Sequence, residues 1–237
     1  MKLYQILAAK LSGKPVAPKE VNIPENQIYN PIGARIGSSI TIDSIDCYGK
    51  HFFVTEIRDN CTKVAGQEFK MSDYTLTAKP LDGKDITVRL RVAEDKCWSL
   101  PSSTCGVPYK AMVLEQHDSL AYDEGLHNVL KETDDTGKFQ IDHDGADSDI
   151  FPRCGGVKGS YKSHLVIVGR ETLAGNADKF PTPLTGTTDI EYWDFSRIVK
   201  QDGVDVEQYL FVEMNTDNGW FELWKGCEID PQKVDAI

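Results

Sequence analysis

The chain has 237 residues, of which 40 % are hydrophobic and 27 % are charged. It is long enough to bury a sizeable core, and its composition is not that of an intrinsically disordered protein. The formal net charge of -11 excludes duplex nucleic acid as a ligand, because phosphate binding needs a basic surface.

The first 14 residues predict a short amphipathic helix. The apolar side chains that follow helical spacing there are Leu3, Ile6, Leu7 and Leu11. Prolines and weak periodicity predict a linker over 15–29, so the folded body is expected to span 30–237. We expect the segment 1–14 to pack on the body, on another protein or on an anionic membrane surface.

The compartment is predicted from the absence of export signals in the sequence. A secretory signal needs about 7 to 15 consecutive apolar residues, whereas the run Ile6-Leu7-Ala8-Ala9 ends at Lys10. We therefore expect a cytoplasmic protein, or one associated with a membrane through 1–14. Its six cysteines are then expected to be thiols, and their spacing matches no common zinc motif.

Strands are predicted where the hydrophobic period becomes two. Strands are expected over 40–43 and 51–58, and a hairpin is expected from 74–79 and 86–92 around the turn Asp82-Gly83. One face of this hairpin is apolar. The other is polar and is expected to face water; its residues include Thr75, Thr77, Arg89 and Arg91.

The middle of the chain predicts strands over 109–115 and 163–168, with a short helix over 120–131 between them. The stretch 133–159 is acidic and rich in turn residues. If the body consists of two subdomains, we expect the boundary in this stretch.

Four carboxylates in that stretch are candidate metal ligands. They are Asp142, Asp144, Asp147 and Asp149. Their close spacing suits Ca²⁺ or Mg²⁺, which prefer oxygen ligands. An EF-hand register fails, because Asp147 occupies the position that requires Gly. An acidic surface loop without a metal is the alternative, and no other cofactor is predicted.

The C-terminal part predicts a three-stranded antiparallel meander. Strands over 193–199, 206–214 and 220–224 are separated by Asp202-Gly203 and Asn218-Gly219, which favour tight hairpin turns. The predicted fold is therefore mainly β, an antiparallel sandwich or barrel-like meanders with one or two short helices.

Aromatic residues of this meander are candidate binding residues. They are Trp193, Tyr209, Trp220 and Trp224. Aromatic residues on both faces of the last hairpin would leave some exposed to a partner or a sugar. The alternative is that all of them belong to the core.

The C-terminal strands also carry a family resemblance. The runs Glu191-Tyr192-Trp193-Asp194-Phe195, Tyr209-Leu210-Phe211-Val212-Glu213 and Gly219-Trp220-Phe221, followed by Cys227-Glu228-Ile229-Asp230-Pro231, resemble the end of the bacterial YjfK-like proteins. The run Asn30-Pro31-Ile32-Gly33 is similar to the start of the same domain. The resemblance implies a supporting role in envelope stress, in the genomic company of phage-shock-like and small inner-membrane proteins. It assigns no catalytic residue.

The leading functional hypothesis is a non-enzymatic interaction protein with a β body. The first alternative is a hydrolase or metal-dependent enzyme that uses the central acidic loop together with scattered His and Cys residues. The second alternative is a carbohydrate-binding β module. The five histidines form no paired motif, so the sequence nominates no catalytic residue.

Overall fold

The structure is a computed structural model. It describes residues 19–20, 29–43, 51–64, 67–78, 85–94, 109–134, 136–142, 148–154, 159–170, 183–217 and 219–237. The predicted helix 1–14 lies outside these residues. Within the predicted linker, β1 (Lys19–Glu20) pairs with β10 (Pro183–Gln201) in the register Lys19↔Thr187.

The chain divides into two compact units that alternate along the sequence. Unit 1 comprises Met1–Ala17, Leu114–Ser163 and Asp189–Glu228; unit 2 comprises Pro18–Val113, His164–Thr188 and Ile229–Ile237. Four strands contribute residues to both: β6 (Tyr109–Leu120), β9 (Tyr161–Arg170), β10 and β12 (Phe221–Ile229). The stretch 133–159, where the sequence suggested a boundary, belongs entirely to unit 1.

Unit 2 contains an antiparallel series of strands in the order β13-β2-β3-β4-β5. Their bounds are β2 Ser39–Ile42, β3 His51–Val64, β4 Gln67–Ala78, β5 Ile86–Glu94 and β13 Val234–Ala236. The β4–β5 hairpin forms as the alternation predicts, with Thr77 opposite Thr87. The predicted turn Asp82-Gly83 lies outside the described residues.

One face of these strands forms the apolar core of unit 2. Its buried members include Phe52, Val54, Tyr74, Leu76, Val88, Leu90 and Val92. Alternate residues of β4 and β5 enter this core, as the period of two requires. A bulge between Val54 and Glu56 shifts the register of β3 by one residue.

The opposite face was predicted to be exposed, and this prediction was wrong in the middle of the strands. Arg89 and Arg91 are 0 % and 2 % exposed, and Asp73 of β4 is 2 % exposed. Thr87, at the described end of β5 nearest the turn, is exposed, and Thr75 and Thr77 are partly exposed. Polar alternation identifies side chains that share a face, but buried ion pairs can remove that face from water.

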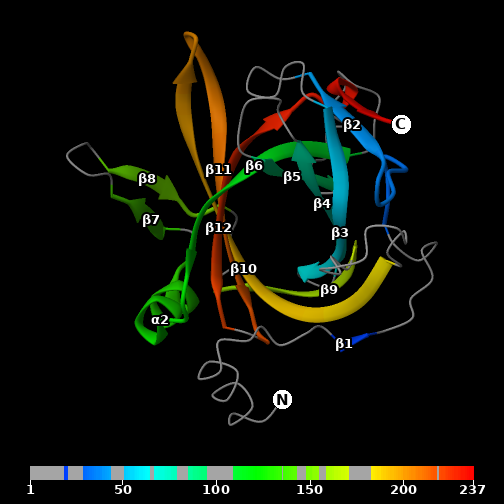
Figure 1. Ribbon diagram of the computed structural model, residues 1–237. Helices are drawn as coiled ribbons and strands as arrows, with labels where there is room; N and C mark the ends of the chain where they lie inside the picture. Colours follow the sequence, from blue (N-terminus) through cyan, green and yellow to red (C-terminus); the bar gives the residue numbers. More distant parts are fainter. Residues whose placement is uncertain are drawn as a thin grey trace. The chain divides into compact units, whose positions relative to one another are not determined.

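Unit 1 contains the predicted C-terminal meander. It consists of β10, β11 (Val204–Asn215) and β12 (Phe221–Ile229), all antiparallel, with Trp193 opposite Val212 and Val212 opposite Leu223. A second sheet is the hairpin of β7 (Lys138–Ile141) and β8 (Asp149–Pro152), which sequence analysis did not predict. The meander and the small hairpin are labelled in Figure 1.

The core of unit 1 joins the meander, the small hairpin and one helix. Its largest buried side chains are Trp193, Phe195, Phe151 and Phe221. The helix α2 (Glu124–Glu132) buries Leu130 in this core, while Phe139 of β7 packs against Phe195.

Helix α2 begins later than predicted, because β6 continues to Leu120 and Asp123 caps the helix. The Asp123 carboxylate accepts a hydrogen bond from the backbone N–H of Leu126 at 2.6 Å. A short 3-10 turn, Pro231–Lys233, precedes β13. The prediction of a mainly β, antiparallel fold with short helices is confirmed. None of the helices in the described ranges is long and apolar enough to cross a membrane.

Candidate functional site

The four aromatic candidates lie in different environments. Trp193 is fully buried in the core of unit 1, and Trp224 is only 6 % exposed. Tyr209 is half-buried, and its hydroxyl donates a hydrogen bond to Glu207 Oε2 at 2.8 Å. Burial and this carboxylate raise the pKa of Tyr209. Trp220 is 47 % exposed. Two of the four, Trp193 and Trp224, are therefore buried, whereas the alternative interpretation expected all four in the core.

The two described metal candidates are engaged with other side chains. Asp149 forms ion pairs with Arg197 and with Lys225, whose Nζ lies 3.3 Å from Asp149 Oδ2. Asp142 accepts hydrogen bonds from Gln140 Nε2 at 2.7 Å and Ser148 Oγ at 2.6 Å. Asp144 and Asp147 lie outside the described residues. Elsewhere in the described ranges, no group of three or more His, Cys, Asp or Glu side chains is arranged to hold a metal ion.

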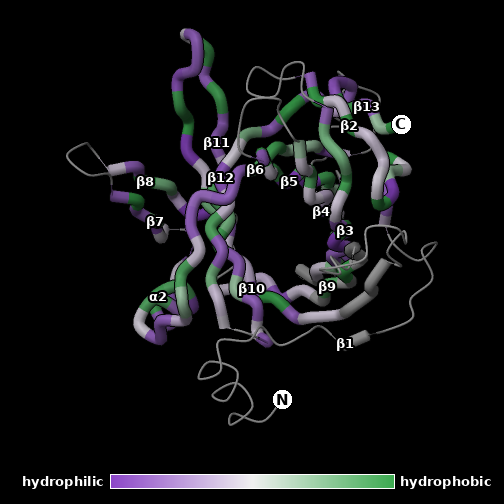
Figure 2. The backbone as a smooth tube through the Cα atoms, in the orientation of Figure 1, coloured by the Kyte–Doolittle hydropathy of each residue, from purple (hydrophilic) through white to green (hydrophobic). Residues whose placement is uncertain are grey.

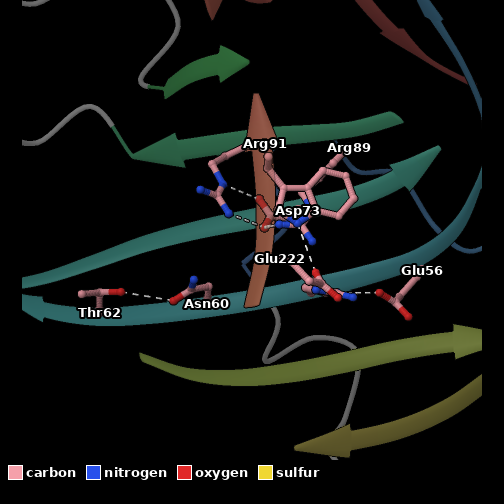
Figure 3. A network of polar contacts seen from close by, with 9 residues as sticks. Glu56, Asn60, Thr62, Asp73, Arg89, Arg91 and Glu222 are labelled. Carbon is pink, nitrogen blue, oxygen red and sulfur yellow. Dashed lines mark hydrogen bonds and ion pairs between the residues drawn. The ribbon is translucent and has the colours of Figure 1, made fainter. Parts of the chain in front are cut away.

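The buried polar face of unit 2 is organised around Asp73. Register places Arg58, Asp73 and Arg91 side by side across β3, β4 and β5. Arg91 donates two hydrogen bonds to Asp73, from Nε and Nη2, each of 2.7 Å (Figure 3). Arg89 Nη1 lies 3.5 Å from Asp73 Oδ2. This fork is the geometry that best compensates a buried carboxylate.

The rest of this face continues the polar pattern along β3. Thr62 donates to Asn60 Oδ1 at 3.2 Å, and both residues are buried. Arg58 and Glu56 form an ion pair of 2.6 Å nearer the bulge. These contacts are mutual and are made within one sheet, so we assign them to the folding of unit 2.

Cys154 of unit 1 is also unsuited to nucleophilic chemistry. Burial raises the pKa of the Cys154 thiol to about 11. The reactive form of a cysteine is the thiolate, so little of it is present at neutral pH. Cys154 is instead anchored through its backbone N–H, which donates to the carbonyl of Asp194 at 2.9 Å.

Residues 198–207 form a two-stranded extension of the meander, which we call the β-arm. The pairing of β11 with β12 ends at Gln208↔Cys227, whereas β10 and β11 remain paired to Gln201↔Val204. The β-arm is the orange hairpin at the top of Figure 1, and hydrophobic and hydrophilic residues alternate along it in Figure 2. Ile198 and Val204 are each 64 % exposed.

The tip of the β-arm has the turn that the sequence predicts. Asp202 has φ 51° and Gly203 has φ 82°. Two successive positive φ values match a type I′ turn, whose twist suits a tight hairpin. Just below the turn, Lys200 and Asp205 form an exposed ion pair of 3.0 Å.

A second constellation in unit 1 is centred on His127. The capped start of α2 places His127 one turn into the helix, where it is 7 % exposed. Its ring lies against Trp193 and Phe221, with centroid distances of 6.0 and 6.1 Å. An imidazole in such a place needs partners for both nitrogens.

Both nitrogens of His127 have partners. Nε2 lies 3.2 Å from Glu191 Oε2, and Nδ1 lies 3.2 Å from the Tyr122 hydroxyl. Ser160 also donates to Glu191 Oε2 at 3.2 Å. A carboxylate can only accept, so in neutral His127 the proton resides on Nε2 and Nδ1 accepts the Tyr122 proton.

The helix predicted over 120–131 contains His127, but the sequence does not connect this residue to a partner. Glu191 is 64 residues away along the chain, and neither residue belongs to a catalytic motif. The only available signal was the helical spacing of His127 and Leu130, which puts both on the buried side of α2.

Comparisons of the chain with protein-family models, with curated proteins and with solved structures found no match.

Proposed function

We propose that this protein is a non-enzymatic interaction protein that binds a partner protein through the β-arm. The observation that carries the proposal is the exposure of Ile198 and Val204 on a hairpin that extends beyond β12. Aliphatic side chains gain free energy when a partner covers them, about 1.5 to 3 kcal/mol for complete burial of each.

The partner segment that suits the β-arm is an extended strand. From Val204 to Glu207, β11 runs beyond its last pair with β12 and can accept a strand along that edge. Val204 and Val206 point to one face, and Asp205 and Glu207 to the other. A complementary strand therefore alternates aliphatic residues with Lys or Arg.

Two other functions have less support in the described residues. A sugar platform needs exposed aromatic rings, but Trp193 and Trp224 are buried. A metal-dependent hydrolase needs available carboxylates, but Asp149 is neutralised by Arg197 and Lys225. Docking through residues 1–14 and the supporting role in envelope stress stay predictions.

The test begins by locating the contact. A photo-reactive phenylalanine analogue is introduced at Val204, and at Val129 of α2 as a control of similar exposure, 67 %. We expect cross-linking of one partner from position 204 and not from 129. Equal cross-linking from both positions contradicts the proposal.

The purified partner then decides the question quantitatively. We expect the double variant Ile198→Glu, Val204→Glu to weaken binding by about 30-fold, which corresponds to about 2 kcal/mol. The matched control, Val129→Glu, makes the same kind of substitution at an exposed aliphatic residue of α2 and should bind as the wild type does. A double variant that binds as the wild type does would overturn the proposal.

A further inference from the structure

A chemical site, separate from the β-arm, is indicated by the hydroxyl of Tyr122. This hydroxyl is held on the acceptor nitrogen of His127, whose other nitrogen donates to Glu191. The order hydroxyl, imidazole, carboxylate is the arrangement by which proteins activate a nucleophilic oxygen. We propose that Tyr122 is an activated phenol that accepts an acyl group from a neutral activated acyl donor.

The identity of the hydrogen-bond acceptor supports this assignment. An imidazole is a stronger base than a carboxylate by about two pKa units in model compounds, so it can take a phenolic proton near neutral pH. Tyr209 provides the contrast within the same unit. Its hydroxyl donates to the carboxylate of Glu207, and its pKa is raised by burial.

The two supporting side chains are largely buried, whereas Tyr122 is partly exposed to solvent. His127 and Glu191 have side chains that are 9 % and 13 % exposed, and Tyr122 is 36 % exposed. The Tyr122 ring stacks on Phe221 at a centroid distance of 6.1 Å and an interplanar angle of 9°. The proton-accepting side is thus fixed by packing while the phenol borders solvent.

The surroundings favour a neutral donor over an anionic one such as a phosphoryl compound. The Glu191 carboxylate lies directly behind His127, and the whole chain carries a net charge of -11. An anionic donor is repelled by this charge. A neutral apolar acyl donor avoids this repulsion and can lie against the exposed part of the Tyr122 ring.

The step conserves atoms and electrons. The phenolic oxygen of Tyr122 forms a bond to the acyl carbon, and the bond from that carbon to the leaving group breaks. The phenolic proton moves to Nδ1 of His127, while Glu191 holds the Nε2 proton and stabilises the imidazolium. The imidazolium then protonates the leaving group, so the products are O-acyl Tyr122 and the free leaving group.

The test uses the full chain and acetylimidazole as the acyl donor. Acetylation of each tyrosine at pH 7 is followed by mass spectrometry and compared with that of N-acetyltyrosinamide, a fully exposed phenol. We expect Tyr122 to react at least 10-fold faster than this reference, and Tyr209 to react more slowly than it. Exposure alone cannot make Tyr122 exceed the reference, so a rate at or below the reference overturns the proposal.

Variants assign the effect to the relay. His127→Gln should reduce the Tyr122 rate to that of the reference or below. Glu191→Gln replaces the charged carboxylate with a neutral amide of the same size. If His127→Gln does not fold, Glu191→Gln should still reduce the Tyr122 acetylation rate several-fold. Lys162→Ala is the matched control, because Lys162 is 80 % exposed and only touches the other Glu191 oxygen at 3.8 Å; its rate should stay within 2-fold of wild type. An unchanged rate in folded His127→Gln or Glu191→Gln contradicts the mechanism.

Discussion

The β4–β5 hairpin and the β-arm are both antiparallel hairpins with polar and apolar residues in alternation, yet their burial is opposite. In β4–β5 the charged residues Asp73, Arg89 and Arg91 are buried. In the β-arm the aliphatic residues Ile198 and Val204 are exposed. The difference teaches that the period of two determines which side chains share a face, whereas the neighbours of that face determine whether it meets water.

The largest loss of stability is expected when the carboxylate at the centre of the buried polar face is removed. We expect Asp73→Ala to reduce the free energy of unfolding by about 3 to 5 kcal/mol, because it leaves two guanidinium groups buried without their shared carboxylate. Urea unfolding followed by circular dichroism measures this loss. In the β-arm, Asp205→Ala removes an exposed ion pair and should change the free energy by less than about 0.5 kcal/mol. Similar losses for the two variants would refute the comparison.

A smaller effect is expected at the tip of the β-arm. Gly203→Ala should destabilise the protein by about 1 kcal/mol, because Gly203 has a positive φ. No heavy atom lies within 4 Å of an added Cβ, so the effect is conformational and not steric crowding. Asp202→Asn is the control, since Asn tolerates positive φ, and its urea midpoint should match that of wild type. An equal loss in both variants would show that the turn conformation is not responsible.

Asp59 is a carboxyl to compare with Asp73. It lies on the other face of β3 and lacks the arginine fork of Asp73. Burial raises its pKa from the ordinary 3.8. The folded state therefore binds a proton more readily than the unfolded state, so stability decreases as pH rises from 3.8 through the raised pKa. Asp59→Asn should raise the urea midpoint at pH 7, and this gain should shrink as the pH approaches 3.8. A gain independent of pH would contradict this explanation.

The smallest effect is expected from the exposed aliphatic residues. The double variant Ile198→Ser, Val204→Ser should keep the free energy of unfolding within about 0.5 kcal/mol of wild type, because these side chains are already largely in water. Val88→Ala in β5 is the buried counterpart and should lose at least about 1 kcal/mol. A large loss in the serine variant would mean that the β-arm is part of the core in solution.

Sequence analysis predicted elements whose signals are local. The turn Asp202-Gly203 and the alternation around Thr77 and Thr87 were sufficient to place two hairpins. The small β7–β8 hairpin was missed, because its apolar residues, such as Phe139 and Phe151, stand in a strongly acidic stretch. The acidic composition of that stretch predicted a loop, but alternate residues of its two strands pack against the meander.

The candidate sites were harder to predict, because they depend on residues distant in sequence. Trp193, Tyr209 and Trp224 were correctly placed on strands, whereas Trp220 lies just before β12. Packing decides that Trp193 is buried and Trp220 is not. The pair of His127 with Glu191, and that of Asp149 with Lys225, each join segments more than 60 residues apart. No single-sequence pattern encodes such pairs without a known motif.

The pairing of β13 with β2 has a consequence for how the protein is made. Val234 pairs with Ile42, so the outer edge of β2 is covered only after about 190 further residues have been translated. At about 5 to 20 residues per second, this interval is on the order of 10 to 40 s. During that time the nascent chain presents an open strand edge, which is the form that other chains can join. Biosynthesis of unit 2 is therefore expected to depend on chaperone protection until its last residues leave the ribosome.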